Sequence, residues 1–254
     1  MIPYLARLLD ITMNNNAIPG DWKKKTIVIL IYKRGDRSVV GNYRPVSLTS
    51  VVCKQMEHVL AGCLRYVWKM RGWLYEGQHG FRPEYSCESK VVTICQDIAD
   101  SLDVGVRTNA IIIDFSKAFD LVPHDRLLTK IEATGVDLRV VVWIKQFLLR
   151  RSQRVRVDGQ LSEEVRVTSG VPQGSVLGPL LFLAYVNDIW RNTESNVWLF
   201  ADDCTIYRKI TDNKDIENLQ KDQNRLGEWA VENEMKINPD KSKAVSVTKA
   251  RVKE

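Results

Sequence analysis

Apolar positions along this 254-residue chain follow helical spacing in some segments and strand spacing in others, without an internal repeat. Helical spacing predicts helices over residues 1–16, 50–69, 87–102, from about 120 to 133, 179–188 and 214–234. Short β-prone runs occupy residues 26–32, 110–113, 197–200, 204–207 and 244–247, and residues 154–157 and 164–167 read as a hairpin across Asp158-Gly159. Helices and strands mix without a regular βαβ cycle, which predicts an α+β fold.

Two of these strand predictions carry acidic residues at their ends. The continuous apolar run 110–113 suits a strand that is buried on both faces, and Asp114 follows it directly. Asp202 and Asp203 lie between two apolar runs, at the predicted turn of a hairpin. Consecutive side chains on a regular strand face opposite ways, so these adjacent acids share a site only if a turn interrupts the alternation. Asp114 and Asp202 would meet if the three strands share one antiparallel sheet.

The composition is that of a folded protein with an excess of basic side chains. The chain is 44% hydrophobic and 27% charged, which argues against disorder and fits one large or two modest globular domains. The formal net charge of +6 favours an anionic partner. Basic residues concentrate in residues 21–44 and 145–156, as a nucleic-acid groove requires, although a solvated surface explains charge alone equally well. Candidate contacts in these blocks are Lys23, Lys24, Lys25, Arg150 and Arg151.

Several other classes of protein are disfavoured. Five cysteines without a Cys-x-x-Cys spacing and three scattered histidines argue against a disulfide framework and against a zinc site. The N-terminus lacks a secretory signal pattern, and the apolar stretch 176–186 is too short to span a bilayer. We therefore expect an intracellular protein of the nucleus and/or the cytoplasm with no membrane partner. The oligomeric state stays open.

The converging carboxylates have a chemical interpretation. Two such groups repel each other unless a cation or a proton compensates their charge. Mg²⁺ prefers oxygen ligands and leaves room for substrate phosphates, and two such ions can promote an in-line phosphoryl displacement. The spacing of the acids is compatible with such a site, and an acidic surface turn is the alternative.

Six sequence blocks give this site a context. They are Asn42-Tyr43-Arg44-Pro45-Val46-Ser47-Leu48, Gln78-His79-Gly80-Phe81-Arg82, Asp114-Phe115-Ser116-Lys117-Ala118-Phe119-Asp120, Gly170-Val171-Pro172-Gln173-Gly174-Ser175, Phe200-Ala201-Asp202-Asp203 and Asn238-Pro239-Asp240-Lys241-Ser242-Lys243. In this order and spacing, over roughly residues 15–248, the chain resembles the reverse transcriptase domain of non-LTR retrotransposons, that is, of long interspersed, jockey-like elements.

The resemblance implies the fingers and palm of a right-hand polymerase. Residues 1–110 would form the fingers with an N-terminal extension, and residues 111–250 the palm, with an antiparallel sheet packed on helices. Residues from about 125 to 168 are candidates for an insertion that contributes to both. We expect no thumb, endonuclease or ribonuclease H in this chain, which would make it a fragment or a truncated copy.

The resemblance also implies roles for individual residues. Asp114 and Asp202 would bind two Mg²⁺ ions, with Mn²⁺ as a substitute, the Phe115 backbone carbonyl as a further ligand and Asp203 as the third, mainly supporting acid. Lys241 would protonate the departing pyrophosphate, with Lys243 as the alternative. Arg82, in the second block, joins the candidate nucleic-acid contacts.

The resemblance implies nucleotide binding at five further positions, with Arg34 as the alternative to one of them. Arg44 would grip the triphosphate through its fixed fork of donors, with Lys33 or Arg34 assisting. Phe119 would crowd the sugar 2′ position and so reject ribonucleotides; the alternative is a core phenylalanine. Gln173 and Gly174 would form a turn against the incoming nucleotide and the template.

The expected function is therefore that of an RNA-directed DNA polymerase. It would add dNTPs to the 3′-hydroxyl of a DNA primer on an RNA template by two-metal-ion catalysis. Two alternatives stay open: a non-catalytic RNA-binding remnant, and a palm-type RNA-dependent RNA polymerase. Phe119 favours deoxynucleotides over the latter.

Overall fold

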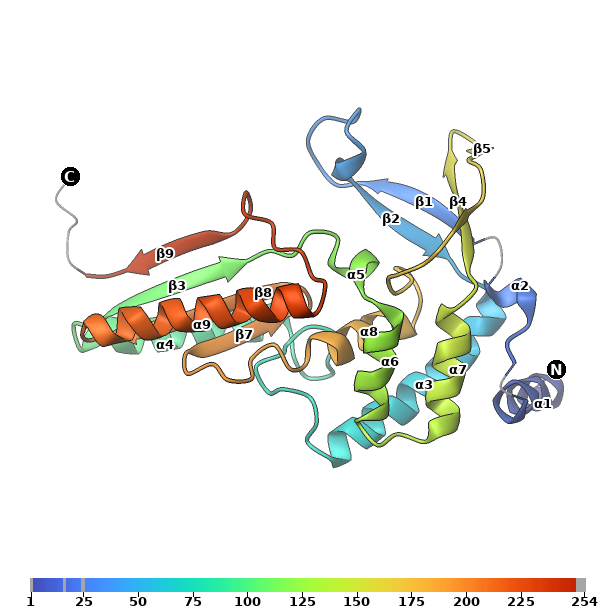
Figure 1. Cartoon of the computed structure of the whole chain (residues 1–254), viewed down its shortest axis with the longest axis horizontal. Coiled ribbons are helices and arrows are strands. Elements are labelled where there is room, and N and C mark those ends of the chain that lie inside the picture. Colours follow the sequence, from blue (N-terminus) through green and yellow to red (C-terminus); the bar gives the residue numbers. More distant parts are fainter. Residues whose placement is uncertain (1, 16, 24–25, 250–254) are drawn as a thin grey trace. The chain divides into compact units, whose positions relative to one another are not determined.

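The computed structural model describes residues 2–15, 17–23 and 26–249 and divides the chain into two compact units (Figure 1). The first unit comprises the chain up to residue 73 together with residues 119–185, and the second comprises residues 74–118 and the chain from 186 onward. Residues 74–110 therefore group with the C-terminal strands, and the expected boundary between fingers and palm near residue 110 stays a prediction. Lys24 and Lys25 lie outside the described residues.

The first unit contains a five-stranded mixed sheet. Its strands are β1 (Thr26–Tyr32), β2 (Tyr43–Leu48), β4 (Ser152–Val157), β5 (Gln160–Leu161) and β6 (Val165–Arg166). β1 lies between β2, which is antiparallel to it, and β4, which is parallel to it. The sequence did not predict β2 because it contains Pro45, which lacks a backbone donor. β2 is an edge strand, where proline is tolerated.

The expected hairpin after β4 is present with a modified return strand. Asp158 and Gly159 both have positive φ, 47° and 81°, as a two-residue hairpin loop of the primed type requires. β5 pairs with the residues next to this loop, and β6 pairs with Ser152 and Gln153 at the far end of β4. The predicted segment 164–167 therefore does return to β4, but through two short strands.

Helices build the core of the first unit. They are α1 (Ile2–Asn14), α2 (Gly20–Lys23), α3 (Val51–Met70), α5 (Ala118–Leu121), α6 (His124–Glu132), α7 (Leu138–Leu148) and α8 (Leu177–Val186), with a 3₁₀ turn η1 at Val40–Asn42. Leu64 of α3, Trp143 of α7 and Phe182 of α8 are fully buried. α8 is apolar on all sides, which is typical of a helix surrounded by other elements. Within the described segments, no helix is both long and apolar enough to cross a membrane.

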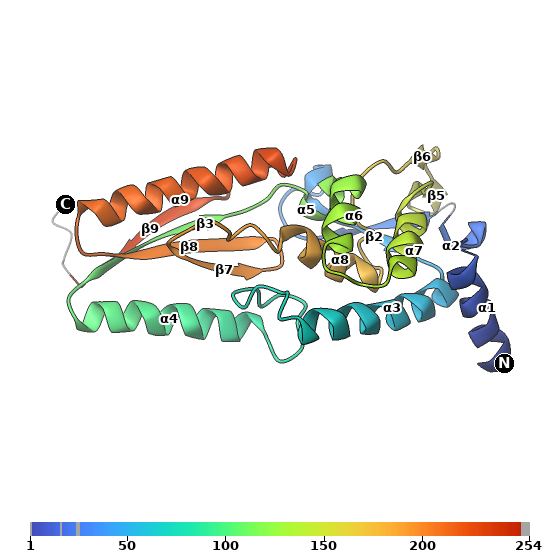
Figure 2. The same cartoon turned by 60° about the horizontal axis from the view of Figure 1, so that its bottom comes forward.

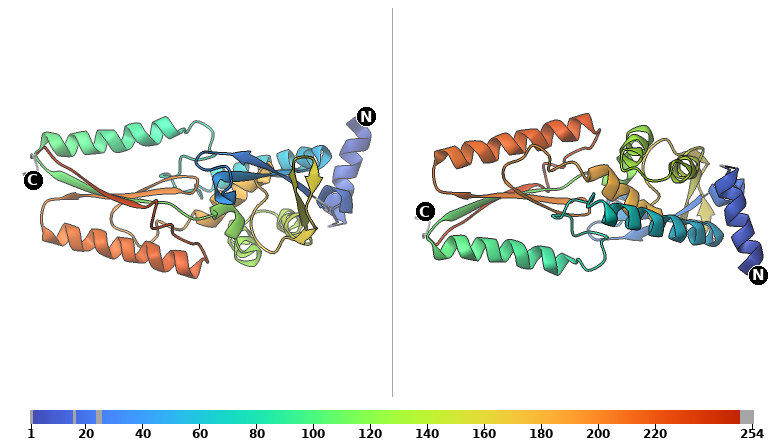
Figure 3. Two further views of the ribbon diagram at one scale, coloured as in Figure 1. Left: turned by 90° about the horizontal axis from the view of Figure 1, so that it is seen from above. Right: turned by 90° about the horizontal axis from the view of Figure 1, so that it is seen from below.

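The second unit is a four-stranded antiparallel sheet between two helices. The strand order is β7 (Asn196–Phe200), β8 (Asp203–Ile210), β3 (Arg107–Ile113) and β9 (Lys243–Val247). α4 (Cys87–Asp103) covers one face of the sheet and α9 (Asn213–Glu232) covers the other (Figures 2 and 3). The prediction that the strands next to the acids share one antiparallel sheet is confirmed.

Candidate active site

The strand register brings the three acids to the same end of the second unit's sheet. β3 pairs with β8 so that Ile113 lies opposite Cys204, and one further step places Asp114 opposite Asp203. β7 pairs with β8 so that Phe200 lies opposite Asp203, which leaves Ala201 and Asp202 as a two-residue turn. Ala201 has φ +56°, so the turn breaks the strand alternation as predicted. Asp114 and Asp202 are half-buried and Asp203 is exposed.

A segment from near the C-terminus runs alongside Asp114. The Ser116 amide donates to the Lys236 carbonyl over 2.7 Å, and the Asn238 amide donates to the Asp114 carbonyl over 2.8 Å. The Asp114 amide in turn donates to the Ser242 hydroxyl oxygen over 3.2 Å. This alignment places Lys241 Nζ 3.8 Å from Asp114 Oδ2.

The alternative lysine has a different place. Lys243 is the first residue of β9 and lies opposite Ile112 in the pairing with β3. The ion pair with Asp114 therefore distinguishes Lys241 from Lys243 geometrically.

Phe115 contributes its backbone and its ring in different directions. Phe115 forms an isolated antiparallel β-bridge with Ile237. The two backbone hydrogen bonds on either side of this bridge are made by its neighbours Asp114 and Ser116. In such an antiparallel pair, the residue between the two bonds directs its own carbonyl to the other edge of the strand, which here is the edge next to β8. Its ring is buried and meets Trp229 of α9 edge-on, with centroids 6.4 Å apart.

The donor set fits a hard divalent cation in its chemistry. Asp114, Asp202, Asp203 and the Phe115 carbonyl are all oxygen donors, and Mg²⁺ is commonly held by one or two carboxylates together with substrate phosphates. Among the described residues, no group of three or more His, Cys, Asp or Glu side chains already forms a metal cage.

Two residues that sequence reasoning missed hold this end of the sheet. Lys90 of α4 is 7% exposed, and its Nζ donates to the Asp203 carbonyl over 3.4 Å. Burial lowers the pKa of Lys90, and the Cys204 thiol and the Asp203 carboxylate next to it act against this. Gln78 is 2% exposed and bonds to the backbone of Ala201. No local pattern reports such partners, which lie more than 100 residues away along the chain.

The first unit gathers the residues expected to bind the nucleotide. The Ser47 amide of β2 donates to the Gln173 carbonyl over 2.7 Å. Gly174 has φ +97°, and a Cβ there would lie 2.9 Å from the Ser47 carbonyl oxygen, so only glycine fits this approach. Arg44 is an exposed residue of the same strand β2, and Lys33 is exposed just after β1.

Phe119 is another residue of the first unit that is expected to bind the nucleotide. Its carbonyl accepts from the Val171 amide over 2.8 Å, and its half-buried ring stacks on Phe182 with centroids 4.3 Å apart.

A residue that sequence reasoning missed, the fully buried Glu57 of α3, fixes the segment that follows Gly174. Its Oε2 accepts from the amides of Val176 and Leu177 over 2.7 and 3.0 Å, at the start of α8.

The candidate nucleic-acid contacts have mixed outcomes. Arg151 is 3% exposed, packs on Phe147 and donates to the Phe147 carbonyl and the Thr26 hydroxyl oxygen. Lys23 is 8% exposed and donates to the Gln146 carbonyl over 3.2 Å. Both cations are therefore nearly buried within the first unit, whereas a nucleic-acid contact would need an exposed side chain.

Arg82 and Arg150 differ from these two. Arg82 is half-buried, donates to the carbonyls of Tyr75 and Gln78, and lies over the ring of Tyr85, so it braces its own loop. Arg150 is exposed, as expected for a nucleic-acid contact.

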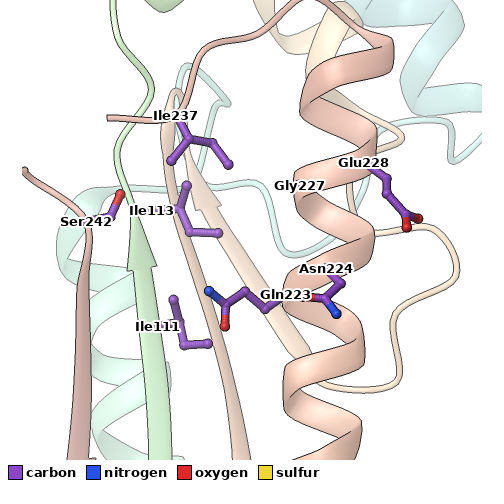
Figure 4. A pocket seen from close by; sticks show the side chains of 8 residues that line it. All are labelled: Ile111, Ile113, Gln223, Asn224, Gly227, Glu228, Ile237 and Ser242. Carbon is purple, nitrogen blue, oxygen red and sulfur yellow. The ribbon is translucent and has the colours of Figure 1, made fainter. Parts of the chain in front are cut away.

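A separate hollow of about 480 Å³ lies between α9 and β3. Figure 4 shows Gln223 extending from α9 toward the strand that carries Ile111. The residues that line the hollow are Ile111, Ile113, Gln223, Asn224, Gly227, Glu228, Ile237 and Ser242. The acids at the end of the sheet do not belong to this lining.

The family model described as reverse transcriptase (RNA-dependent DNA polymerase) matches residues 23–253. The chain belongs to this reverse transcriptase family. The resemblance drawn from the six blocks is thereby confirmed.

Relatives of this chain include transposon proteins of Drosophila melanogaster. The probable RNA-directed DNA polymerase from transposon X-element is 32% identical over 96% of the chain, and the one from transposon BS is 31% identical over 95%. The RNA-directed DNA polymerase from mobile element jockey is 28% identical over 94% of the chain. The chain spans only 27–28% of the length of these relatives.

Solved telomerase structures share the fold of this chain. Apo telomerase from Candida tropicalis, truncated from its C-terminal domain, aligns with 93% of the chain and 52% of its own length, at a TM-score of 0.62 and 14% identity. Telomerase from Candida albicans, in complex with a fragment of telomeric RNA, aligns with 97% of the chain and 46% of its own length, at a TM-score of 0.60 and 15% identity. The α+β fold expected from the sequence, with the fingers and palm of a polymerase, is confirmed.

Proposed function

We propose that this chain is the part of an RNA-directed DNA polymerase that carries out nucleotidyl transfer. The observation that carries the proposal is the register of β3, β7 and β8, which brings Asp114, Asp202 and Asp203 to one end of a sheet. Relatives that are named RNA-directed DNA polymerases support it. The partners in this proposal are an RNA template, a DNA primer and dNTPs.

Metal binding would use the oxygen donors at the end of the sheet. Asp114 and Asp202 would hold two Mg²⁺ ions, or Mn²⁺ as a substitute, with the Phe115 carbonyl and Asp203 completing the donor set. Such ions, when bound, supply activation of the primer hydroxyl and compensation of charge on the phosphates. The turn at Ala201 serves this arrangement because it frees Asp202 from the strand alternation.

The side chains of the first unit would select and orient the nucleotide. Arg44, assisted by Lys33, would bind the triphosphate, since both cations are exposed at neighbouring ends of paired strands. Gln173 and Gly174 would present their backbone to the base pair from a turn that is fixed on β2. Phe119 would exclude a 2′-hydroxyl with a ring that Phe182 holds in place.

Lys241 would act on the leaving group. Its Nζ lies 3.8 Å from Asp114 Oδ2 and its side chain is 60% exposed, so it is accessible to a bound substrate. Donation of its proton to the pyrophosphate oxygen would lower the charge of the leaving group as the bond breaks.

Primer extension tests this proposal. The chain is incubated with Mg²⁺, an RNA template and a DNA primer, and the incorporation of dNTPs is compared with that of NTPs. We expect wild type to prefer dNTPs and Phe119→Val to accept NTPs at least about tenfold better relative to dNTPs, ~1.4 kcal/mol of discrimination. Phe119→Tyr retains the ring and is the matched control, which should leave the preference unchanged.

The two rival functions predict other results. Preference of the wild type for NTPs would favour an RNA-dependent RNA polymerase. Tight RNA binding without extension under any of these conditions would favour a non-catalytic remnant.

A further inference from the structure

The loop before α4 forms an additional partner for β7. Gln78 bridges to Leu199 in parallel orientation. The Leu199 amide donates to the Gly77 carbonyl over 2.8 Å, and the His79 amide donates to the Leu199 carbonyl over 2.9 Å. Residues 77–80, called here the Gln78 loop, therefore follow the outer side of β7 as far as the turn that carries Asp202.

The side chain of Gln78 bonds to the turn itself. Its Oε1 accepts from the Ala201 amide over 3.0 Å and from the Gly80 amide over 2.8 Å. Its Nε2 donates to the Ala201 carbonyl over 3.4 Å. One buried amide thus engages both backbone groups of the residue that immediately precedes Asp202.

These bonds act on a conformation that needs support. Ala201 is not glycine yet has φ +56°, a left-handed conformation that is unfavourable for a residue with a Cβ. The turn is also enclosed, because Ala201 is 6% exposed and a Cβ on Gly80 would overlap its backbone nitrogen. Loss of the Gln78 amide would leave the buried backbone groups of Ala201 without these hydrogen bonds, which is destabilising.

We propose that Gln78 is a positioning residue for metal binding: its side-chain amide fixes the Ala201 peptide and thereby the direction in which Asp202 leaves the turn. The inference rests on the proposed function, since it assigns Asp202 to the metal. It adds a residue outside the donor set that is proposed for the metal.

The structure supplies a matched comparison at the other end of β7. Asp222 of α9 is 1% exposed, and its Oδ2 accepts from the amides of Glu194 and Ser195 over 3.1 and 2.8 Å, just before β7 begins. Asp222 and Gln78 are therefore both buried side chains that hold backbone at an end of β7. Only Gln78 adjoins the acids.

The experiment compares Gln78→Met, which removes the amide at similar volume, with Asp222→Leu. Three properties are measured for each: the melting temperature, the exchange of amide hydrogens in residues 199–203, and the affinity for Mn²⁺ by electron paramagnetic resonance. We expect both variants to lower the melting temperature. Gln78→Met alone should accelerate exchange at Ala201 and weaken Mn²⁺ binding about tenfold, with a matching rise in the Mg²⁺ concentration needed for extension.

A second variant covers the case in which Gln78→Met does not fold. Gln78→Glu retains an oxygen that can accept from Ala201 and Gly80, and it should keep the slow exchange of the Ala201 amide. Fast exchange in Gln78→Glu would contradict the role of that oxygen.

The remaining outcomes separate the inference from the function on which it rests. Wild-type Mn²⁺ affinity in Gln78→Met, or equal weakening in Asp222→Leu, would overturn the inference alone. Failure of the wild type itself to bind Mn²⁺ would overturn the metal site of the proposed function, and the positioning role with it.

Discussion

The acids show what single residues reveal without a structure. Strand alternation implies that Asp202 and Asp203 can act together only at a turn, and the buried run before Asp114 supplies a third carboxylate. Gln78, Lys90 and Glu57 could not be assigned in this way. Glutamine, lysine and glutamate are usually exposed, and the bonds that bury these three join residues more than 100 positions apart.

Lys241 can be separated from Lys243 by substitution. Lys241→Ala should slow a single nucleotide addition about 100-fold, because it removes the cation that lies at Asp114, and general acids contribute at least about that much. Lys243→Ala, the matched control at the start of β9, should remain within about twofold of wild type. Single-turnover rates decide the assignment, and equal losses in the two variants would contradict it.

Elements were predictable where local pattern and tertiary position agree. The strand 197–200, the helix beginning at Cys87 and the turn at Asp158-Gly159 have clear periodic or turn signals. β2 was not predicted because of Pro45, and the first half of β3 was not predicted because Arg107, Thr108 and Asn109 are polar. Pairing with β8 and β9 makes those three residues part of a strand, and tertiary contact here overrides local propensity.

The start of α9 should make stability dependent on pH. Asp215 accepts bonds from the Thr211 hydroxyl and amide and from Arg208, and these bonds hold its pKa well below the ordinary value of 3.8. A lowered pKa contributes stability that is present above the unfolded value and is lost as pH falls through the folded value.

Asp215→Asn tests that contribution. It should lower the melting temperature at pH 7 and reduce the loss of stability between about pH 4 and pH 2. Glu217→Gln, on the exposed side of the same helix and outside the capping box, is the control. Identical acid unfolding of wild type and Asp215→Asn would show that these bonds do not stabilise the fold.

At the scale of the whole molecule, the chain passes twice through each unit. The acids proposed to bind metal and Lys241 belong to the second unit, whereas Arg44, Phe119, Gln173 and Gly174 belong to the first. The expected boundary near residue 110 followed sequence order. That boundary between fingers and palm stays a prediction, whereas the compact units follow the pairing of β3 with strands that are formed about 100 or more residues later, which no local pattern indicates.

The central claim is that Asp114 and Asp202, which the pairing of β3, β7 and β8 brings to one end of the sheet, hold the metal ions for nucleotidyl transfer. Its most direct test is the single-turnover rate of one dNTP addition by wild type, Asp114→Asn and Asp202→Asn, with Asp103→Asn at the exposed end of α4 as control. We predict that each active-site substitution slows addition about 10³-fold or more, ~4 kcal/mol, with little change in melting temperature, and that the control keeps the wild-type rate. Addition by Asp202→Asn within about tenfold of wild type would contradict the claim.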